Sequence, residues 1–303
     1  MKPISALIKL ARPAQWVKNI FVFTALIFSG LVGNPVAVLD AIIAFGTFSL
    51  VSSAVYYLND FMDIEEDKKH EEKRYRPLAA GILPRSAGSI GFFVLSAGAL
   101  ALTYATLGSV STLILFCYLT MNLGYSFGLK HIVILDVLII SAGFVLRILA
   151  GAAAISRLPS TWLILCGVTI SLFLGFTKRK AEIVYLGESA AKHRKVLGQY
   201  NESFLDQAIS IVTAATVICY ILYTVDPQTV SMVGSRMLLF SVPPVLYGIF
   251  RYLYLVYHER SGGDPTRTVF TDIPLLLTGG TWAVLCAIII LFGTTIADLF
   301  SKS

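Results

Sequence analysis

The chain has 303 residues, of which 56% are apolar and only 14% are charged, and its formal net charge is +6. This composition is too apolar for a soluble domain and predicts an integral membrane protein that crosses the bilayer many times. The positive charge is weak evidence for nucleic-acid binding, because such a chain leaves no soluble domain to carry a basic binding face.

Apolar runs of about 20 residues can each cross a bilayer as a helix. Nine such helices are predicted, at residues 15–35, 38–59, 87–106, 109–127, 132–153, 160–177, 207–226, 236–257 and 273–297. Only Leu107-Gly108-Ser109 separates the third run from the fourth. The first run is long and lacks a small-residue cleavage site, so we do not expect a cleavable signal.

Lysine and arginine are distributed unevenly over the loops. Most of them lie in the N-terminal segment and in loops 60–86 and 178–206, and Arg260 and Arg267 are counted on the same side. The opposite side carries only Arg157, Arg236 and Lys302. Because basic residues concentrate on the cytoplasmic side, we expect a multi-pass protein of the cell inner (plasma) membrane whose active site faces the cytoplasm. The predicted fold class is all-α, a single domain over 1–303 with nine transmembrane helices in a bundle and cytoplasmic cap loops.

The end of the second predicted helix carries an aspartate-rich run, Asn59-Asp60-x-x-Asp63-x-x-x-Asp67. In a continuous helix the three aspartates return to nearly one face. Carboxylates so close together repel one another unless a cation lies between them, and oxygen ligands suit Mg²⁺. We therefore predict that the aspartates are catalytic and that they bind Mg²⁺ together with Asn59. The alternative is a solvated charged loop that caps a membrane helix.

Basic residues follow this run at Lys73, Arg74 and Arg76. Cations next to a magnesium site can bind phosphate groups, and arginine does so with two parallel hydrogen bonds. We predict that these three side chains bind substrate phosphate. The alternative is that they only set the topology of the membrane helices.

A second charged segment follows the sixth predicted helix, where Lys178, Glu182 and Tyr185 share a helical face. We predict that they bind substrate as the second wall of a polar chamber. A lysine at this position favours a further anionic group over a second metal ion. The alternative is a solvated amphipathic stretch.

Two more cations are candidates for substrate binding. Arg147 lies about 16 Å along a helix from Asp136, and charges at membrane depth usually face the bundle interior with a partner. Structural pairing and a substrate role are equally compatible with that position, and Arg251 invites the same interpretation. Lys18, beside Asn19 at the entrance to the first helix, lies where a lipid phosphate would be expected.

These residues resemble the UbiA superfamily of intramembrane prenyltransferases over nearly the whole chain. The resemblance is carried by the run 59–67, by Arg76-Pro77-Leu78 with Gly81, by Tyr125-Ser126 to Leu129-Lys130 with Asp136, and by Arg147 within 143–151. It implies a nine-helix bundle with a cytoplasm-facing polar cavity that opens laterally to lipid. It also implies Mg²⁺ as the cofactor that activates a diphosphate leaving group, and it adds Lys130 to the substrate-binding residues.

One segment departs from the pattern of the superfamily. Ordinary members carry a second aspartate-rich motif after the sixth helix, whereas this chain has Lys178-Arg-Lys-Ala-Glu182-Ile-Val-Tyr185-Leu-Gly-Glu188. Together with segments 15–19 and 73–77, this makes the chain similar to a branch with reversed roles. There the donor is the water-soluble phosphoribosyl diphosphate and the acceptor is a lipid, a polyprenyl (decaprenyl) phosphate. The implied reaction is Mg-dependent transfer of 5-phosphoribose with release of diphosphate.

Two rival functions remain to be compared. A conventional UbiA-type prenyltransferase would use an isoprenoid diphosphate donor and an aromatic or other acceptor. A transporter or lipid flippase would carry charged residues through the bilayer midplane and broken helices in matching halves, which fits this sequence poorly. The sequence leaves homo-oligomer formation open.

Overall fold

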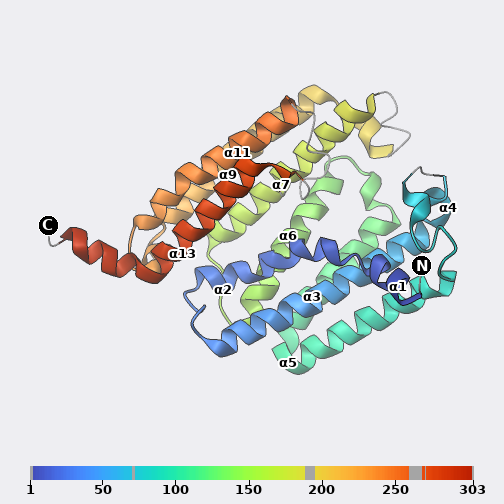
Figure 1. Ribbon diagram of the computed structural model, residues 1–303, viewed down its shortest axis with the longest axis horizontal. Coiled ribbons are helices and arrows are strands. Elements are labelled where there is room, and N and C mark those ends of the chain that lie inside the picture. The colour runs from blue at the N-terminus through green and yellow to red at the C-terminus, as the bar shows by residue number, and fades with distance from the viewer. Residues whose placement is uncertain (1–2, 70–71, 188–194, 259–267, 270, 302–303) are drawn as a thin grey trace. The chain divides into compact units, whose positions relative to one another are not determined.

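The computed structural model describes the chain except residues 1–2, 70–71, 188–194, 259–267, 270 and 302–303 (Figure 1). The helices are α1 (Pro3–Ala11), η1 (Pro13–Phe23), α2 (Thr24–Phe28), α3 (Pro35–Met62), α4 (Ile64–Asp67), η2 (Lys73–Tyr75), α5 (Arg85–Phe127), η3 (Leu129–His131), α6 (Leu135–Ala154), α7 (Thr161–Leu186), η5 (Lys195–Gln199), α9 (Glu202–Val225), α10 (Pro227–Val233), η6 (Met237–Ser241), α11 (Val242–Tyr257) and α13 (Ile273–Ser301). The described part of the chain contains no strand. Glu188, Arg260 and Arg267, which entered the sequence predictions, lie outside the described residues.

Seven of these helices are long and apolar enough to cross a membrane. They are α3, α5, α6, α7, α9, the segment Met237–Tyr257 and the part of α13 at Ile273–Gly293. The prediction of an all-α, multi-pass membrane protein is therefore confirmed. The count of nine stays a prediction, because the first expected helix, 15–35, is divided between the 3₁₀ helix η1 and the short helix α2.

The third and fourth predicted spans both belong to α5, whose helical path breaks at Gly108. Gly108 has φ 79° and ψ −175°, a conformation that residues with a Cβ rarely adopt. A Cβ on Gly91, near the start of α5, would lie 2.2 Å from the ring of Tyr57. Ser126, near the end of α5, contacts Asn59 two residues further along α3. Both ends of α5 thus lie beside the same end of α3, so the chain reverses direction at Gly108.

The chain divides into two compact units. Unit one comprises 1–27, 31–128 and 146–158, and unit two comprises 28–30, 129–145 and 159–303. Helix α6 contributes its first half to unit two and its second half to unit one. The single domain predicted over 1–303 stays a prediction.

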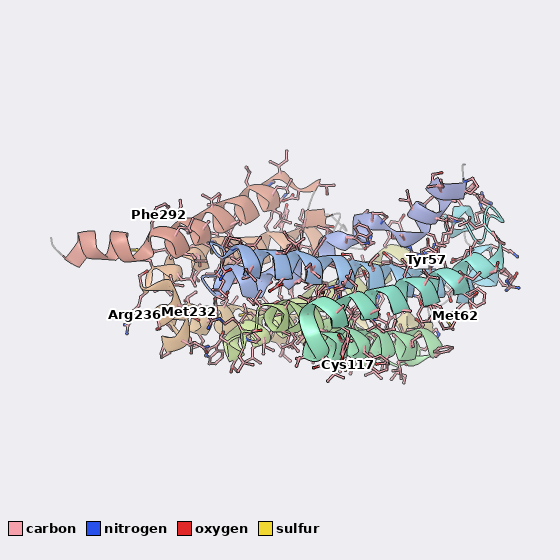
Figure 2. The ribbon with its side chains drawn as sticks, turned by 90° about the horizontal axis from the view of Figure 1, so that it is seen from below. Tyr57, Met62, Cys117, Met232, Arg236 and Phe292 are labelled. Atoms are coloured by element: carbon pink, nitrogen blue, oxygen red, sulfur yellow. The ribbon has the colours of Figure 1, made fainter. Side chains whose placement is uncertain are left out.

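Unit one is built around α3 and α5. Asn34 caps α3 by accepting hydrogen bonds from the backbone N–H groups of Val36 and Ala37, at 3.0 and 3.3 Å. Buried apolar side chains then fill the space between the two helices, among them Phe48 and Val51 on α3. Tyr57 and Met62, labelled in Figure 2, lie in the last turns of α3, where its polar residues gather.

The N-terminal helices pack along that polar end of α3. Pro13 lacks a backbone N–H and disfavours the α conformation in the residue before it. Helix α1 therefore ends at Ala11, and Arg12 adopts the left-handed conformation, with φ 50° and ψ 59°. Hydroxyl groups of α3 donate hydrogen bonds to backbone carbonyls of α1. Tyr57 donates to Leu7 O at 2.9 Å, and Ser53 donates to Ala11 O at 2.9 Å. The side chain of Arg12 is thereby held beside α3.

Unit two is built around α7, α9, α11 and α13. Ser160 and Asn201 cap α7 and α9 by accepting hydrogen bonds from the backbone N–H groups of Leu163 and Phe204. Phe173, Leu205 and other buried apolar side chains form the core of this unit. Met232, Arg236 and Phe292 mark the end of the unit where the turn between α10 and η6 meets α13 (Figure 2).

Gly151 should be indispensable for the packing of η1 on α6. A Cβ at this position would lie 1.8 Å from the carbonyl oxygen of Val22, a backbone atom that cannot rotate away. We expect Gly151→Ala to lower the free energy of unfolding by at least about 3 kcal/mol, because overpacking forces the backbone to shift. Thermal unfolding of detergent-purified protein measures the effect.

The matched control is Gly98→Ala in α5, where an added Cβ meets no atom within 4 Å. Alanine has the higher helix propensity, so this variant should be as stable as the wild type or slightly more so. Equal melting temperatures for the two variants would contradict the proposed close contact.

Candidate functional site

From the sequence, the aspartate-rich run was expected to lie on one continuous helix, but the structure divides it between two helices. Helix α3 ends at Met62, and Asp63, with φ −94° and ψ 10°, joins it to α4. The N–H of Asp63 donates to Asn59 O at 2.9 Å, and the N–H of Asp67 donates to Asp63 O at 2.8 Å. The chain therefore keeps turning, but the spacing of 100° per residue is lost at Asp63. The assumption of a continuous helix was wrong for this reason, although Asp60 and Asp67 still meet the same nitrogen of Arg76.

Arg76 joins the two buried carboxylates of the run. Its Nη1 donates to Asp60 Oδ1 at 3.1 Å and to Asp67 Oδ2 at 2.7 Å. The side chains of Asp60 and Asp67 are only 2% and 5% exposed, whereas that of Arg76 is 25% exposed. Burial without a partner would strongly disfavour either carboxylate, so the guanidinium stabilises the acidic pair.

Arg12 is a second cation at the same carboxylate, and sequence analysis missed it. Its Nη2 also donates to Asp60 Oδ1, and its guanidinium carbon lies 4.7 Å from the centre of the Tyr56 ring. The only sequence signal is that Arg12 precedes Pro13, which ends α1 next to α3. Without the fold, this arginine looked like one of several basic residues that set the topology.

Asn59 is held by the end of α5. The Ser126 hydroxyl donates to Asn59 Oδ1 at 2.5 Å, and Ser126 Oγ also lies 2.8 Å from Asn122 O. Since two oxygens only 2.5 Å apart repel one another unless a proton lies between them, the hydroxyl proton points toward Asn59. Ser126 therefore fixes the orientation of this amide.

The predicted basic residues occupy different surroundings. Of Lys73, Arg74 and Arg76, the structure brings Arg76 to the acidic pair. Arg74 is exposed and lies over the ring of Tyr75, with Nη2 donating to the Tyr75 hydroxyl at 2.9 Å. Lys73 is half-buried in the same short helix, η2.

Arg147 is buried within unit one, as predicted, and has polar partners. Its Nε donates to Asn19 Oδ1 at 2.8 Å and its Nη2 donates to the Tyr118 hydroxyl at 3.1 Å. The guanidinium carbon lies 5.0 Å from the ring centres of both Phe48 and Tyr118. Asn19 is fully buried, while its neighbour Lys18 is half-buried in η1. A substrate role for Lys18 and Arg147 stays a prediction.

Unit two places the second charged segment at the end of α7. Glu182 accepts a hydrogen bond from Arg179 Nη1 at 2.7 Å, and Lys178 Nζ lies 3.9 Å from its other oxygen. Tyr185 is 80% exposed on the same helix. Lys130 lies in η3, before α6. Whether Lys178, Glu182, Tyr185 and Lys130 meet substrate stays a prediction.

Arg179 also anchors α7 to α6, a contact that sequence analysis missed. Its Nε donates to Asp136 Oδ2 at 2.8 Å, with both side chains at most 1% exposed. The Tyr200 hydroxyl donates to Asp136 Oδ1 at 2.7 Å and accepts from the backbone N–H of Ile134 at 2.7 Å. Burial, with the hydrogen bond to the carboxylate, raises the pKa of Tyr200 above its ordinary value.

Two further ion pairs stabilise unit two. Lys180 contacts Asp206 and lies 4.1 Å from the ring centre of Tyr257. Arg251, which the sequence placed at membrane depth, pairs with Asp272 through Nη2 at 2.7 Å. That hydrogen bond from Arg251 lowers the pKa of Asp272, and Asp272 Oδ1 caps α13 by accepting from Leu275 N at 2.9 Å.

The donor atoms of the aspartate-rich run suit Mg²⁺ in kind, since they are carboxylate and amide oxygens. Within the described ranges, no group of three or more His, Cys, Asp or Glu side chains is placed to hold a metal ion. Mg²⁺ is usually bound by one or two carboxylates together with substrate phosphates rather than by a closed protein cage. The residues therefore fit a cation that arrives with a phosphorylated substrate.

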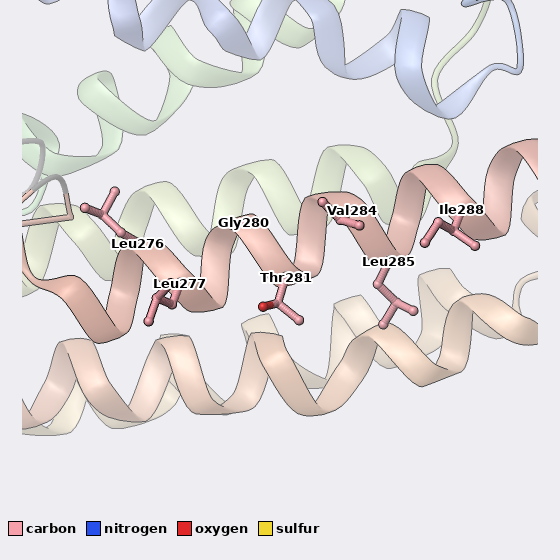
Figure 3. A pocket seen from close by; sticks show the side chains of 7 residues that line it. All are labelled: Leu276, Leu277, Gly280, Thr281, Val284, Leu285 and Ile288. Carbon is pink, nitrogen blue, oxygen red and sulfur yellow. The ribbon is translucent and has the colours of Figure 1, made fainter.

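An open apolar groove of about 460 Å³ runs along α13 (Figure 3). It is lined by Leu276, Leu277, Gly280, Thr281, Val284, Leu285 and Ile288. Thr281 contributes the single polar side chain, so this groove has no chemistry for a diphosphate.

The helical fold and the charged site together define a class of protein, an intramembrane transferase with acidic and basic side chains at the ends of apolar helices. The sequence matches the UbiA prenyltransferase family over residues 19–273. The chain belongs to this family, and the predicted resemblance and transferase class are confirmed.

Curated relatives carry one recurring name. The chain is 34% identical over 291 residues to a decaprenyl-phosphate phosphoribosyltransferase of Corynebacterium glutamicum, covering 94% of this chain and 86% of that protein. A protein of the same name from Mycobacterium tuberculosis is 32% identical over 294 residues, which is 96% of each chain.

Solved structures agree with the fold. A UbiA homolog from Archaeoglobus fulgidus bound to GPP and Mg²⁺ has a TM-score of 0.66 at 15% identity, covering 97% of this chain and 99% of that one. A structure of digeranylgeranylglyceryl phosphate synthase has a TM-score of 0.69 at 17% identity, covering 96% and 99%. At these identities the likeness shows the fold alone.

The pair of Asp136 and Arg179 should dominate the stability of the cluster around α6 and α7. Replacing Asp136 by alanine leaves the guanidinium of Arg179 buried without this carboxylate, which should cost about 3–5 kcal/mol of unfolding free energy. Tyr200→Phe removes one hydrogen bond to a charged group and should cost about 1.5–3 kcal/mol. Thermal unfolding in detergent should rank the melting temperatures accordingly.

Tyr185→Phe is the control, because this exposed hydroxyl should contribute little. If Asp136→Ala melted at the temperature of the wild type, the buried pair would not be a stabilising contact.

Proposed function

We propose that this chain transfers 5-phosphoribose from phosphoribosyl diphosphate to a polyprenyl phosphate and releases diphosphate, in a Mg-dependent reaction. The observation that carries the proposal is the name shared by two of its curated relatives, which match at 32–34% identity over 94–96% of the chain in two genera. Each of those relatives is called decaprenyl-phosphate phosphoribosyltransferase.

The donor's diphosphate would bind at the polar end of α3. The run from Asn59 to Asp67 offers oxygen ligands for Mg²⁺, and Arg76 contacts Asp60 and Asp67 of this run, with Lys73 and Arg74 close by in sequence. Bound there, Mg²⁺ supplies positive charge that neutralises the departing diphosphate. The guanidinium of Arg76 donates hydrogen bonds to the same leaving group.

The proposed transfer of phosphoribose does not require a general base to deprotonate the acceptor. When the bond between the ribose anomeric carbon and diphosphate breaks, positive charge develops on the ribose and is stabilised by nearby carboxylates. The lipid phosphate oxygen, already an anion at neutral pH, attacks from the opposite face. The product is a polyprenyl-phosphoryl 5-phosphoribose with inverted configuration. We assign the lipid phosphate to Lys18, at the entrance to the first predicted helix, and to Arg147, whose guanidinium contacts the neighbouring residue Asn19.

The end of α7 supports a sugar donor over an isoprenoid donor. Glu182 is the one described carboxylate of its segment, and Arg179 and Lys178 place positive charge on both of its oxygens. A second metal ion at this carboxylate would be repelled by both cations. We therefore assign Lys178, Glu182, Tyr185 and Lys130 to contacts with the phosphoribosyl group.

The proposal also covers the membrane topology and the location of the enzyme. We infer that it is one domain of nine membrane-spanning helices in the inner (plasma) membrane, with cap loops and active site facing the cytoplasm. The distribution of lysine and arginine supports this orientation. The observation in favour of the second candidate function, prenyl transfer from an isoprenoid diphosphate, is that the matching family is described as prenyltransferases.

Purified protein should make a new glycolipid from phosphoribosyl diphosphate, Mg²⁺ and decaprenyl phosphate. Thin-layer chromatography with radiolabelled ribose measures the product, and addition of EDTA should abolish it, because the leaving diphosphate then lacks its cation. A parallel reaction with geranyl diphosphate and an aromatic acceptor should give none. Prenyl transfer in that reaction, without phosphoribosyl transfer in the first, would replace the proposal by its alternative.

Asp63→Asn should reduce phosphoribosyl transfer by at least about a hundredfold while the protein remains folded, because a neutral amide binds Mg²⁺ much more weakly than a carboxylate. Glu65→Gln is the matched control, since Glu65 is an exposed carboxylate two residues away that pairs with Lys68. Its rate should equal that of the wild type. Full activity in Asp63→Asn would count against a catalytic role for the run.

A further inference from the structure

The aspartates of the run differ in their surroundings. The Oδ1 atom of Asp60 accepts hydrogen bonds from two guanidiniums, those of Arg12 and Arg76, and the side chain is 2% exposed. Asp67 shares Arg76 and receives it on Oδ2. Asp63 is half-buried at the junction of α3 and α4.

The surroundings of Asp60 oppose metal binding. A divalent ion held by this carboxylate would lie within a few ångströms of two guanidinium groups. Charges of the same sign at such distances repel strongly in a partly buried site. Asp60 thus already accepts hydrogen bonds from two guanidiniums, whereas Asp67 accepts from one of them.

The two arginines are better suited than Asp60 to meet an anion. Their side chains are 28% and 25% exposed above the buried carboxylate. Arg12 uses Nη2 and Arg76 uses Nη1 for the acids, so each guanidinium keeps further N–H groups that contact no acceptor among the described residues. Planar guanidiniums with spare donors match the oxygens of a phosphate group.

We propose that Asp60 is a positioning residue and not a metal ligand, and that it holds Arg12 and Arg76 as a paired clamp for a diphosphate. Asn59, Asp63 and Asp67 remain the oxygen ligands for the cation. Arg12 adopts the left-handed conformation before Pro13, and its side chain contacts Asp60. The inference rests on the proposed function only in taking the anion to be the donor's diphosphate.

Two binding measurements on detergent-purified protein separate the roles. Electron paramagnetic resonance gives the affinity for Mn²⁺ as a substitute for Mg²⁺, and calorimetry gives the affinity for inorganic diphosphate at saturating Mn²⁺. Asp63→Asn should weaken Mn²⁺ binding by at least about tenfold, because a carboxylate ligand is lost, whereas Asp60→Asn should change it by less than about threefold, because no ligand is lost. Asp60→Asn and Arg12→Gln should each weaken diphosphate binding by about tenfold.

The double variant tests whether Asp60 acts through Arg12. If it does, the combined loss of diphosphate affinity should be smaller than the product of the two single losses. Arg85→Gln is the control, because this exposed arginine lies outside the clamp, and both of its affinities should match the wild type.

Loss of Mn²⁺ affinity in Asp60→Asn equal to that in Asp63→Asn would overturn the proposal. Should Asp60→Asn fail to fold, Arg12→Gln decides alone, and unchanged diphosphate binding in that variant would refute the clamp. Inorganic diphosphate is the leaving group of phosphoribosyl and isoprenoid donors alike. The result therefore does not depend on which donor the enzyme uses.

Discussion

A buried carboxylate with two guanidiniums on one oxygen organises unit one. Asp60 draws Arg12 from the N-terminal segment and Arg76 from the loop after α4 to the end of α3. Leaving a carboxylate at 2% exposure without partners would cost several kcal/mol, so both segments are constrained to stay. The same contacts bring two positively charged, partly exposed side chains to the aspartate-rich run.

Unit two also contains a buried carboxylate that is paired with a guanidinium. Arg179 lies between Asp136 on α6 and Glu182 on its own helix, and Tyr200 completes the shell of Asp136. These bonds fix the end of α7 and leave Glu182 neutralised by cations. Two of the three basic residues at the end of α7 thus contact the carboxylate of this segment, Glu182.

The two networks lie on a fold that does not depend on them. The fold neighbours share the helical architecture at 15–17% identity, so the architecture does not depend on the particular charged residues. Under the function proposed above, the side chains at the helix ends select the donor. In this chain the acidic run before Arg76 is kept, while the position after the sixth predicted helix carries Lys178, Arg179 and Lys180.

The sequence alone determined the class of fold, because apolar length and the absence of soluble-domain composition leave a membrane helix bundle as the stable arrangement. It also located the run from Asn59 to Asp67 and the family, since both are local patterns. Only the tertiary structure decided that Asp60 forms ion pairs with Arg12 and Arg76, that Ser126 orients Asn59, and that Arg179 pairs with Asp136. Those partners lie 16 to 67 residues apart along the chain, and helical periodicity carries no information about which distant side chain meets a buried charge. The turn at Asp63 escaped prediction for a related reason, because the spacing of residues on a helix face assumes a regular backbone.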